Sequence, residues 1–176
     1  MTIRSFDGFT PVLAPSVFVD DMALVLGNVT IGPDSSIWPM TVVRGDVHRI
    51  SIGARTNIQD GSVLHVTSDN HFNPGGFPLS IGDDVTVGHG VILHACTIES
   101  LTLIGMGSTV LDGAIVRRGA MVAAGSLVPP GKDLEGGFLW KGSPVQKGRP
   151  LTPKETEFLQ FSALHYVALK DRHLKS

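Results

Sequence analysis

The fold is decided by a stretch in which an aliphatic residue returns at every sixth position. Residues 104–128 read IGMGSTVLDGAIVRRGAMVAAGSLV. The recurring positions are Ile104, Val110, Val116, Val122 and Val128. This period matches neither the 3.6-residue turn of an amphipathic helix nor the alternation of a long β-strand. It predicts a coil of short flat strands, each one hexapeptide long and three to a turn, whose aliphatic side chains point inward.

The same six-residue step can be followed upstream through most of the chain. Its earlier positions are Val19, Val25, Ile31, Ile37, Val43, Ile52, Ile58, Leu64, Ile81, Val87 and Leu93. Inward side chains of successive coils would stack about 4.8 Å apart, the spacing of paired strands. The sequence therefore predicts an all-β protein, a parallel β-helix of hexapeptide repeats. Glycine, with 21 of 176 residues, would serve the corners of the coil.

The repeat is interrupted at three places, where extra residues would leave the coil as surface loops. There are three extra residues between Val43 and Ile52, eleven between Leu64 and Ile81, and five between Leu93 and Ile104. Insertions in solenoids often lie on the binding face, although neutral drift of loop length explains any single one equally well.

We expect one domain with four segments. Residues 1–18 would cap the open end of the coil, 19–131 would form the β-helix, 132–152 would cross its other end, and 153–172 would form a helix. The helix is predicted by a capping box, Thr152 to Glu155, with proline at the first helical position.

The predicted helix carries an apolar stripe. Its members are Phe158, Phe161, Leu164 and Ala168. An amphipathic helix buries such a stripe. We expect this one to pack along the β-helix or against a neighbouring chain.

The composition excludes several classes of protein. With 42% hydrophobic residues the chain is too apolar for disorder. The single cysteine, Cys96, excludes a disulfide framework or a Cys-based zinc cluster, and we expect a buried thiol there. A net charge of −2 gives no drive toward nucleic acid, and no apolar run approaches the roughly 18 residues of a membrane span. These features predict a soluble, cytoplasmic protein without nucleic-acid or membrane partners.

Three of the seven histidines fall in the repeat frame. His65 follows Leu64 and His94 follows Leu93, so the two imidazoles would stack in consecutive coils and could share one metal ion. His89 lies five residues before His94, around a corner of the coil. One ion is therefore not expected to take all three imidazoles from one subunit. Our hypothesis is that His89 completes the site of an adjacent subunit in a homotrimer.

The remaining histidines have no such pattern. His71 lies in the longest insertion, where a loop role is favoured over a place in the metal site. His48, His165 and His173 are expected to be solvated or to lie at an interface.

Four segments resemble the gamma class of carbonic anhydrases, which are left-handed hexapeptide-repeat proteins. The matching segments are Arg44-Gly45-Asp46, Asn57-Ile58-Gln59-Asp60-Gly61, His65, and Gly88-His89-Gly90-Val91-Ile92-Leu93-His94. The resemblance covers roughly residues 8–151. It implies the left hand of the coil. It also implies that His65, His89 and His94 bind zinc, or alternatively iron or cobalt, between two subunits of a trimer, with water as fourth ligand.

The resemblance also implies roles for residues around the metal. Gln59 would orient the bound hydroxide or CO2, Asp60 would help to hold Arg44 or a ligand, and Tyr166 would point toward the site. Arg44 and Asp46 would form an ion pair at the subunit interface, although pairing within one coil is an equal alternative. Gln59 could instead cap a corner, Asp60 could serve a turn, and Tyr166 could simply pack.

The chain departs from well-characterised members of that class where a proton path is expected. Some members carry a glutamate just after the Arg-Gly-Asp and another in a loop after the first zinc histidine. Here Val47 follows Asp46, and residues 66–71 contain no glutamate. Asp69 or His71 would have to substitute. Hydration of CO2 could therefore be weak.

Three functions compete on the sequence alone. The first is reversible hydration of CO2 to bicarbonate by a metal-bound hydroxide at the trimer interface, which we favour. The second is hydrolysis of thioesters at the same metal, or hexapeptide acyl transfer, which needs no metal. The third is a non-catalytic trimer in which the metal only stabilises the assembly.

Overall fold

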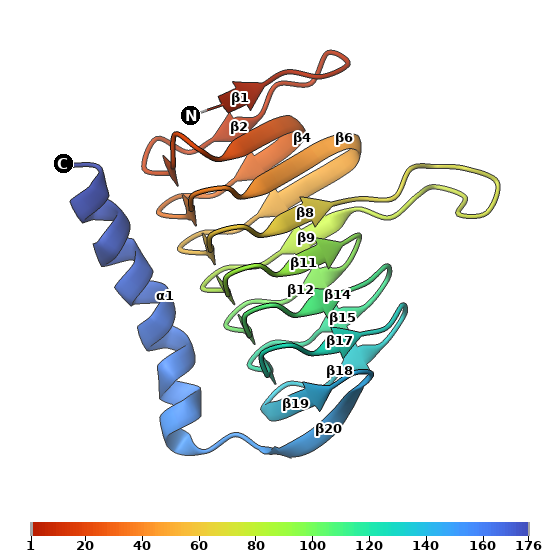
Figure 1. The fold of residues 1–176 in the computed structure, drawn as a ribbon, viewed down its shortest axis with the longest axis vertical. Coiled ribbons are helices and arrows are strands. Elements are labelled where there is room, and N and C mark those ends of the chain that lie inside the picture. The colour runs from red at the N-terminus through yellow and green to blue at the C-terminus, as the bar shows by residue number, and fades with distance from the viewer. Residues whose placement is uncertain (1, 176) are drawn as a thin grey trace.

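The computed structural model describes residues 2–175, which form a three-faced parallel β-solenoid with one helix along its side (Figure 1). This confirms the fold class predicted from the repeat. The first face contains β3 (Phe18–Val19), β5 (Ser36–Ile37), β7 (Asn57–Ile58), β10 (Thr86–Val87), β13 (Leu103–Ile104), β16 (Met121–Val122) and β19 (Phe138–Gly142), with β20 (Val145–Pro150) added antiparallel.

The other two faces are joined because two long strands run around the edge between them. These strands are β4 (Leu24–Ile31) and β6 (Val42–Ile52). The second face contains their first halves and β1 (Thr2–Arg4), β8 (Val63–His65), β11 (Ile92–His94), β14 (Thr109–Val110) and β17 (Leu127–Val128). The third contains their second halves and β2 (Val12–Leu13), β9 (Leu79–Ile81), β12 (Thr97–Ile98), β15 (Ile115–Val116) and β18 (Asp133–Leu134).

The core is the stack of aliphatic residues that the six-residue step predicts. Every predicted inward position except the partly buried Val19 is at most 4% exposed. The glycine that follows many of these residues is explained by close approach of neighbouring coils. A Cβ on Gly105, for example, would lie 2.4 Å from the backbone nitrogen of Ala124, where no side chain fits.

One predicted interruption of the repeat is wrong. Between Leu93 and Ile104 the chain has no five-residue insertion, because Ile98 supplies a core position of the third face and pairs with Ile81. The coil is instead one residue short at this point. Ala95 turns the corner with a φ of 50°, which brings Ile98 inward a residue early. The insertion after Leu64 does leave the coil, as the long projecting loop in Figure 1.

The solenoid is longer than residues 19–131. At its start β1 and β2 already pair with β4, so the predicted cap supplies strands of the first coil. At its end β18 and β19 continue two of the faces through the predicted crossing segment. The six-residue count continues into β18, because Leu134 lies six residues after Val128 and is fully buried. It ends at β19, where Trp140, not an aliphatic residue, fills the last inward position on the first face.

Helix α1 (Pro153–His173) returns along the solenoid and lies against β5, β7 and β10 (Figure 1). Its buried residues are Leu159, Ser162, Ala163 and Lys170. Of the predicted apolar stripe, Phe161, Leu164 and Ala168 lie on the exposed side of the helix, whereas Phe158, about half exposed, lines a cavity between the helix and the first face. Apart from Leu159, the residues that dock the helix are small or polar, and Ser162 bonds Thr86 on the outer side of the first face. Among the described residues, no helix is long and apolar enough to cross a membrane.

The helix begins with the predicted capping box, and its acidic member gives a first testable prediction. Glu155 accepts hydrogen bonds from Arg149 at 2.7 and 2.8 Å and from the Thr152 backbone N–H at 2.8 Å. The guanidinium of Arg149, and then Thr152, lower the pKa of Glu155 to about 2.

A depressed folded-state pKa stabilises the fold above the ordinary value of about 4.3, and this contribution is lost as the pH falls through about 2. We expect carboxyl-carbon NMR to give a Glu155 midpoint near 2, and R149M to move it toward 4. An unchanged midpoint in R149M would contradict the assigned cause.

Candidate metal centre

Two of the predicted ligands, His65 and His94, face each other at one corner of the solenoid. They end β8 and β11 and are register partners in adjacent coils, as the repeat predicts. His65 Nδ1 lies 3.2 Å from His94 Nε2. Two nitrogen ligands of a tetrahedral zinc ion, each 2.0–2.1 Å from the metal, lie about 3.3 Å apart. The separation of the two rings therefore fits two ligands of one ion.

The other ring nitrogen of each histidine is held by a carboxylate. His65 Nε2 lies 3.0 Å from Asp46 Oδ1, and His94 Nδ1 lies 2.6 Å from Asp112 Oδ1. Each carboxylate accepts the ring proton, so both nitrogens that face each other carry lone pairs. Two lone pairs at this distance repel unless a cation lies between them. Carboxylates of this kind also fix the ring and increase its basicity as a ligand.

The electrostatics keep this arrangement in the form that binds metal. Burial lowers the pKa of His65 despite its bond to Asp46, so its imidazole is neutral near pH 7. Burial raises the pKa values of Asp46 and Asp112, but hydrogen bonds outweigh it and hold both below the usual value. The bonds come from Arg44 and His65 to Asp46 and from Thr67 and His94 to Asp112. Both carboxylates are thus ionised acceptors.

The third predicted ligand, His89, lies elsewhere. It occupies the corner between β10 and β11, at the other edge of the second face. Its Nδ1 lies 2.9 Å from Asp60 Oδ2, so it has the same carboxylate support as the other two, and its side chain is half exposed. Within residues 2–175, no three metal-binding side chains meet around one point. A single subunit therefore offers two ligands at one corner and one at another.

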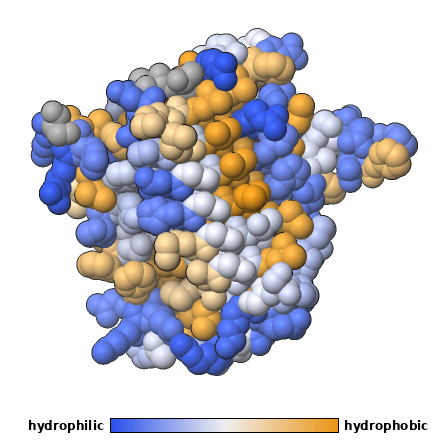
Figure 2. All heavy atoms as spheres, viewed as in Figure 1, coloured by the Kyte–Doolittle hydropathy of each residue, from blue (hydrophilic) through white to orange (hydrophobic). Residues whose placement is uncertain are grey.

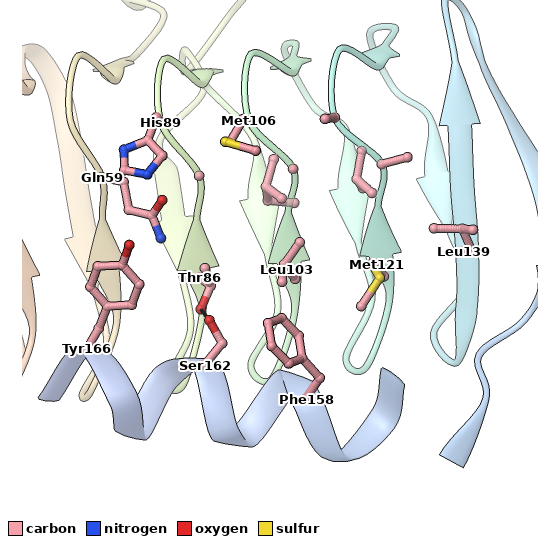
Figure 3. Close-up of a pocket in the computed structure, with 16 residues that line it drawn as sticks. Gln59, Thr86, His89, Leu103, Met106, Met121, Leu139, Phe158, Ser162 and Tyr166 are labelled. Carbon is pink, nitrogen blue, oxygen red and sulfur yellow. Dashed lines mark hydrogen bonds between the residues drawn. The ribbon is translucent and has the colours of Figure 1, made fainter. Parts of the chain in front are cut away.

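The predicted residues Gln59 and Tyr166 lie on the same side as His89. They line one end of a cavity of about 470 Å³ between α1 and the first face (Figure 3). Gln59 is 5% exposed and donates from Nε2 to Asn57 Oδ1 at 3.0 Å. Tyr166 packs edge-on against Trp38, and burial and the charge of Asp60 raise the pKa of its hydroxyl. The rest of the cavity is largely apolar, with Met106, Met121 and Phe158 along it.

Of the two alternatives for Arg44 and Asp46, the structure shows pairing within one chain, where Arg44 binds Asp46 directly. Because Asp46 also holds His65, the pair supports a predicted ligand whether or not it contacts a second subunit. The loop residue His71 stacks on exposed Phe72, and Asp69 is engaged with the Gly75 backbone, so both organise the loop. Cys96 is buried as expected, and burial raises the pKa of its thiol well above the usual range.

Sequence reasoning missed Asp112, Thr67 and Asn57. The period gives no exact signal for Asp112, because Leu93 pairs with Val110, 17 residues further on, whereas Asp112 lies 18 residues after His94. Asn57 has a signal, since it lies two residues before Gln59 along an extended segment and must share its face. Thr67 carries none, because it lies in the inserted loop, whose path no period describes.

Relatives of known name match nearly the whole chain. Protein YrdA of Escherichia coli is 53% identical over 172 residues, covering 98% of this chain and 94% of its own. A carbonic anhydrase of Geobacillus kaustophilus is 47% identical over 165 residues, covering 94% and 87%. The mitochondrial gamma carbonic anhydrase 1 of Arabidopsis thaliana is 45% identical over 163 residues, which are 93% of this chain and 59% of that protein.

The chain belongs to the gamma carbonic anhydrase family. No protein-family model matches it. Among solved structures, a putative acetyltransferase of Bacillus cereus superposes with a TM-score of 0.91 at 40% identity, covering 98% of this chain and 96% of that one. This chain thus shares its coil with a protein named for acyl transfer.

The carboxylate behind His94 gives a prediction for this member of the gamma carbonic anhydrase family. D112N keeps the shape of the side chain but weakens its hold on the ring proton of His94. We expect metal affinity to fall about 10- to 100-fold, as for other carboxylates that support ligand histidines. Competition with a chromophoric chelator measures this.

The matched control is D133N, which alters a surface carboxylate paired with Arg117. It should leave the metal affinity unchanged. Equal affinities in D112N and the wild-type protein would show that Asp112 does not support a ligand.

Proposed function

We propose that this protein is a metal-dependent carbonic anhydrase that reversibly hydrates CO2 to bicarbonate at sites shared between subunits of a homotrimer. The observation that carries the proposal is the pair of lone-pair nitrogens of His65 and His94, 3.2 Å apart, each backed by an aspartate. His89, with Asp60 behind it, supplies the third nitrogen from a neighbouring subunit. Membership of the gamma carbonic anhydrase family supports the same reaction.

The donor set suits zinc, with iron or cobalt as alternatives. Three imidazoles are neutral ligands, so a divalent ion keeps its full charge. When bound, such an ion lowers the pKa of water to about 7 and so supplies a nucleophile near neutral pH.

The protein's own side chains hold and orient the reactants. Asp46, Asp60 and Asp112 fix the three rings with their lone pairs outward. Gln59 presents one amide N–H and a carbonyl oxygen beyond its bond to Asn57, and these orient a hydroxide or CO2 beside His89. Tyr166, whose hydroxyl stays protonated, closes the same end of the cavity.

The second face supports the trimer because its outer surface is apolar between the two histidine corners. Leu24, Val42, Val63 and Ile92 are successive register partners on that surface. Val63 and Ile92 are more than 40% exposed. Figure 2 shows hydrophobic residues gathered over this part of the solenoid. A neighbouring subunit that packs there would cover these four apolar side chains and bring its own His89 corner to the site.

The test is a stopped-flow assay of CO2 hydration with a pH indicator. Metal-loaded protein should accelerate proton release, a chelator should remove the acceleration, and added zinc, iron or cobalt should restore it. The same sample should elute as a trimer. Metal-loaded trimers that do not accelerate hydration would contradict the proposal.

The apolar cavity favours one second candidate, hydrolysis of a thioester. Its lining by Met106, Met121 and Phe158, running from His89, would suit an acyl chain. The similarity to the Bacillus cereus putative acetyltransferase supports acyl chemistry on this coil. Assaying acyl-CoA hydrolysis and acyl transfer beside CO2 hydration separates these activities. Bound metal without any activity would favour a purely structural metal.

A further inference from the structure

A chain of buried polar side chains connects helix α1 to Gln59. Gln59 Nε2 donates to Asn57 Oδ1 at 3.0 Å, and Asn57 Nδ2 donates to Thr86 Oγ1 at 3.1 Å. The Thr86 hydroxyl in turn bonds Ser162 Oγ of α1 at 2.9 Å. Figure 3 shows Ser162 reaching from the helix to Thr86, beneath Gln59 and His89. Asn57 and Thr86 are register partners on β7 and β10, so stacking of the coils places them together.

The direction of this chain is determined by its surroundings. Asn57 Nδ2 also lies 3.4 Å from the Val85 carbonyl oxygen, which can only accept. The amide nitrogen of Asn57 must therefore face Val85 and Thr86, and its oxygen must face Gln59. Gln59 must then turn its own nitrogen toward Asn57. Its carbonyl oxygen is left for the end of the cavity that it shares with His89.

Burial makes this orientation costly to reverse. Asn57, Thr86, Gln59 and Ser162 are between 1% and 7% exposed, so little water can replace a lost partner. A 180° flip of the Gln59 amide would set its oxygen against the oxygen of Asn57. Unpaired buried polar groups of this kind are strongly disfavoured. A series of side chains in which every polar group is paired is therefore held rigidly in one arrangement.

We propose that Thr86 and Ser162 are positioning residues that hold the Gln59 carboxamide in one orientation through Asn57. Docking of α1 thereby anchors the orientation that the Val85 carbonyl oxygen sets. Resting on the proposed carbonic anhydrase function, this inference assigns the two hydroxyls to the geometry of that site. Neither hydroxyl touches the reactants.

The test uses T86V in the full-length protein, because valine keeps the shape of threonine and removes only the hydroxyl. The Gln59 side-chain amide is observed by ¹⁵N NMR, assigned with Q59E, in metal-free and metal-loaded samples. We expect its proton exchange to be about tenfold faster in T86V than in the wild-type protein, and kcat for CO2 hydration to fall about five- to tenfold at unchanged metal content. S162A should shift the same amide signals by a smaller amount. T86S, which restores the hydroxyl, should recover most of both properties.

The control is T102V, which removes a buried hydroxyl that donates to the Glu99 carbonyl oxygen. This hydrogen bond does not belong to the series that links Ser162 to Gln59. T102V should lower the melting temperature about as much as T86V and leave the Gln59 signals and kcat unchanged. Unaltered Gln59 signals in T86V would overturn the proposal, whatever the activity. So would altered signals with unchanged kcat in an active enzyme. If the wild-type protein hydrates no CO2, altered signals in T86V and their recovery in T86S still support the positioning of Gln59 by Thr86. In that case only the proposed function fails.

Discussion

Replacing His65, His89 or His94 with alanine is expected to remove the bound metal from the protein. Each substitution deletes one of three nitrogen ligands. Loss of a ligand should weaken binding by more than the roughly 100-fold that loss of a supporting carboxylate costs. CO2 hydration should fall to the uncatalysed rate with it. Metal analysis after gel filtration, with a stopped-flow assay on the same fractions, measures both effects.

The fold should survive these substitutions because all three side chains point away from the core. We expect the metal-free variants to melt within about 2 °C of the metal-free wild-type protein. H165A is the control, since His165 is exposed on α1 and belongs to neither corner. Stoichiometric metal in H65A, H89A or H94A would exclude that histidine as a ligand.

Mixing two inactive variants is expected to regenerate active sites when they damage opposite corners. In mixed trimers of H65A and H89A, a site is intact where an H89A chain supplies His65 and His94 and its neighbour, an H65A chain, supplies His89. With equal amounts and random assembly, half of the corners that carry His65 and His94 are intact, and so are half of the corners that carry His89. About a quarter of the sites should therefore recover metal and activity.

Mixing H65A with H94A provides the matched control. Both variants damage the same corner, so every site lacks one nitrogen and none should recover. Subunits are exchanged by mild denaturation, and mass spectrometry verifies that mixed trimers have formed. Recovery in neither mixture would place all three ligands in one subunit, and equal recovery in both would contradict two distinct corners.

The six-residue period predicts much of the metal centre because it is a geometric rule. Residues in equivalent positions of adjacent coils must stack, so His65 and His94 meet wherever the coil forms. The same rule places His89 at another corner. It does not point to Asp112, because the coil after Leu93 spans 17 residues and Asp112 lies 18 residues after His94. The period cannot predict the place of Thr67, because that residue belongs to an insertion.

Helix α1 shows where pattern alone is insufficient. Its apolar stripe predicts packing along the solenoid or against a neighbouring chain, but the residues buried against the solenoid include Ser162 and Lys170, which lie outside the stripe. A stripe shows that a surface will be covered without showing what covers it. In this protein the first face carries the buried hydroxyl of Thr86, which forms a hydrogen bond with Ser162 of the helix. Phe158 lines the neighbouring cavity, and Phe161 stays exposed.

Sequence alone thus determines the coil, its core and the pairing of two histidines, because these follow from a short period that every turn repeats. Only the tertiary structure decides which carboxylate holds each imidazole, which face of α1 is buried, and which way the Gln59 amide points. Those features depend on contacts between segments 18 to 76 residues apart. Their partners are selected by the path of corners, loops and the returning helix, which the repeat does not encode.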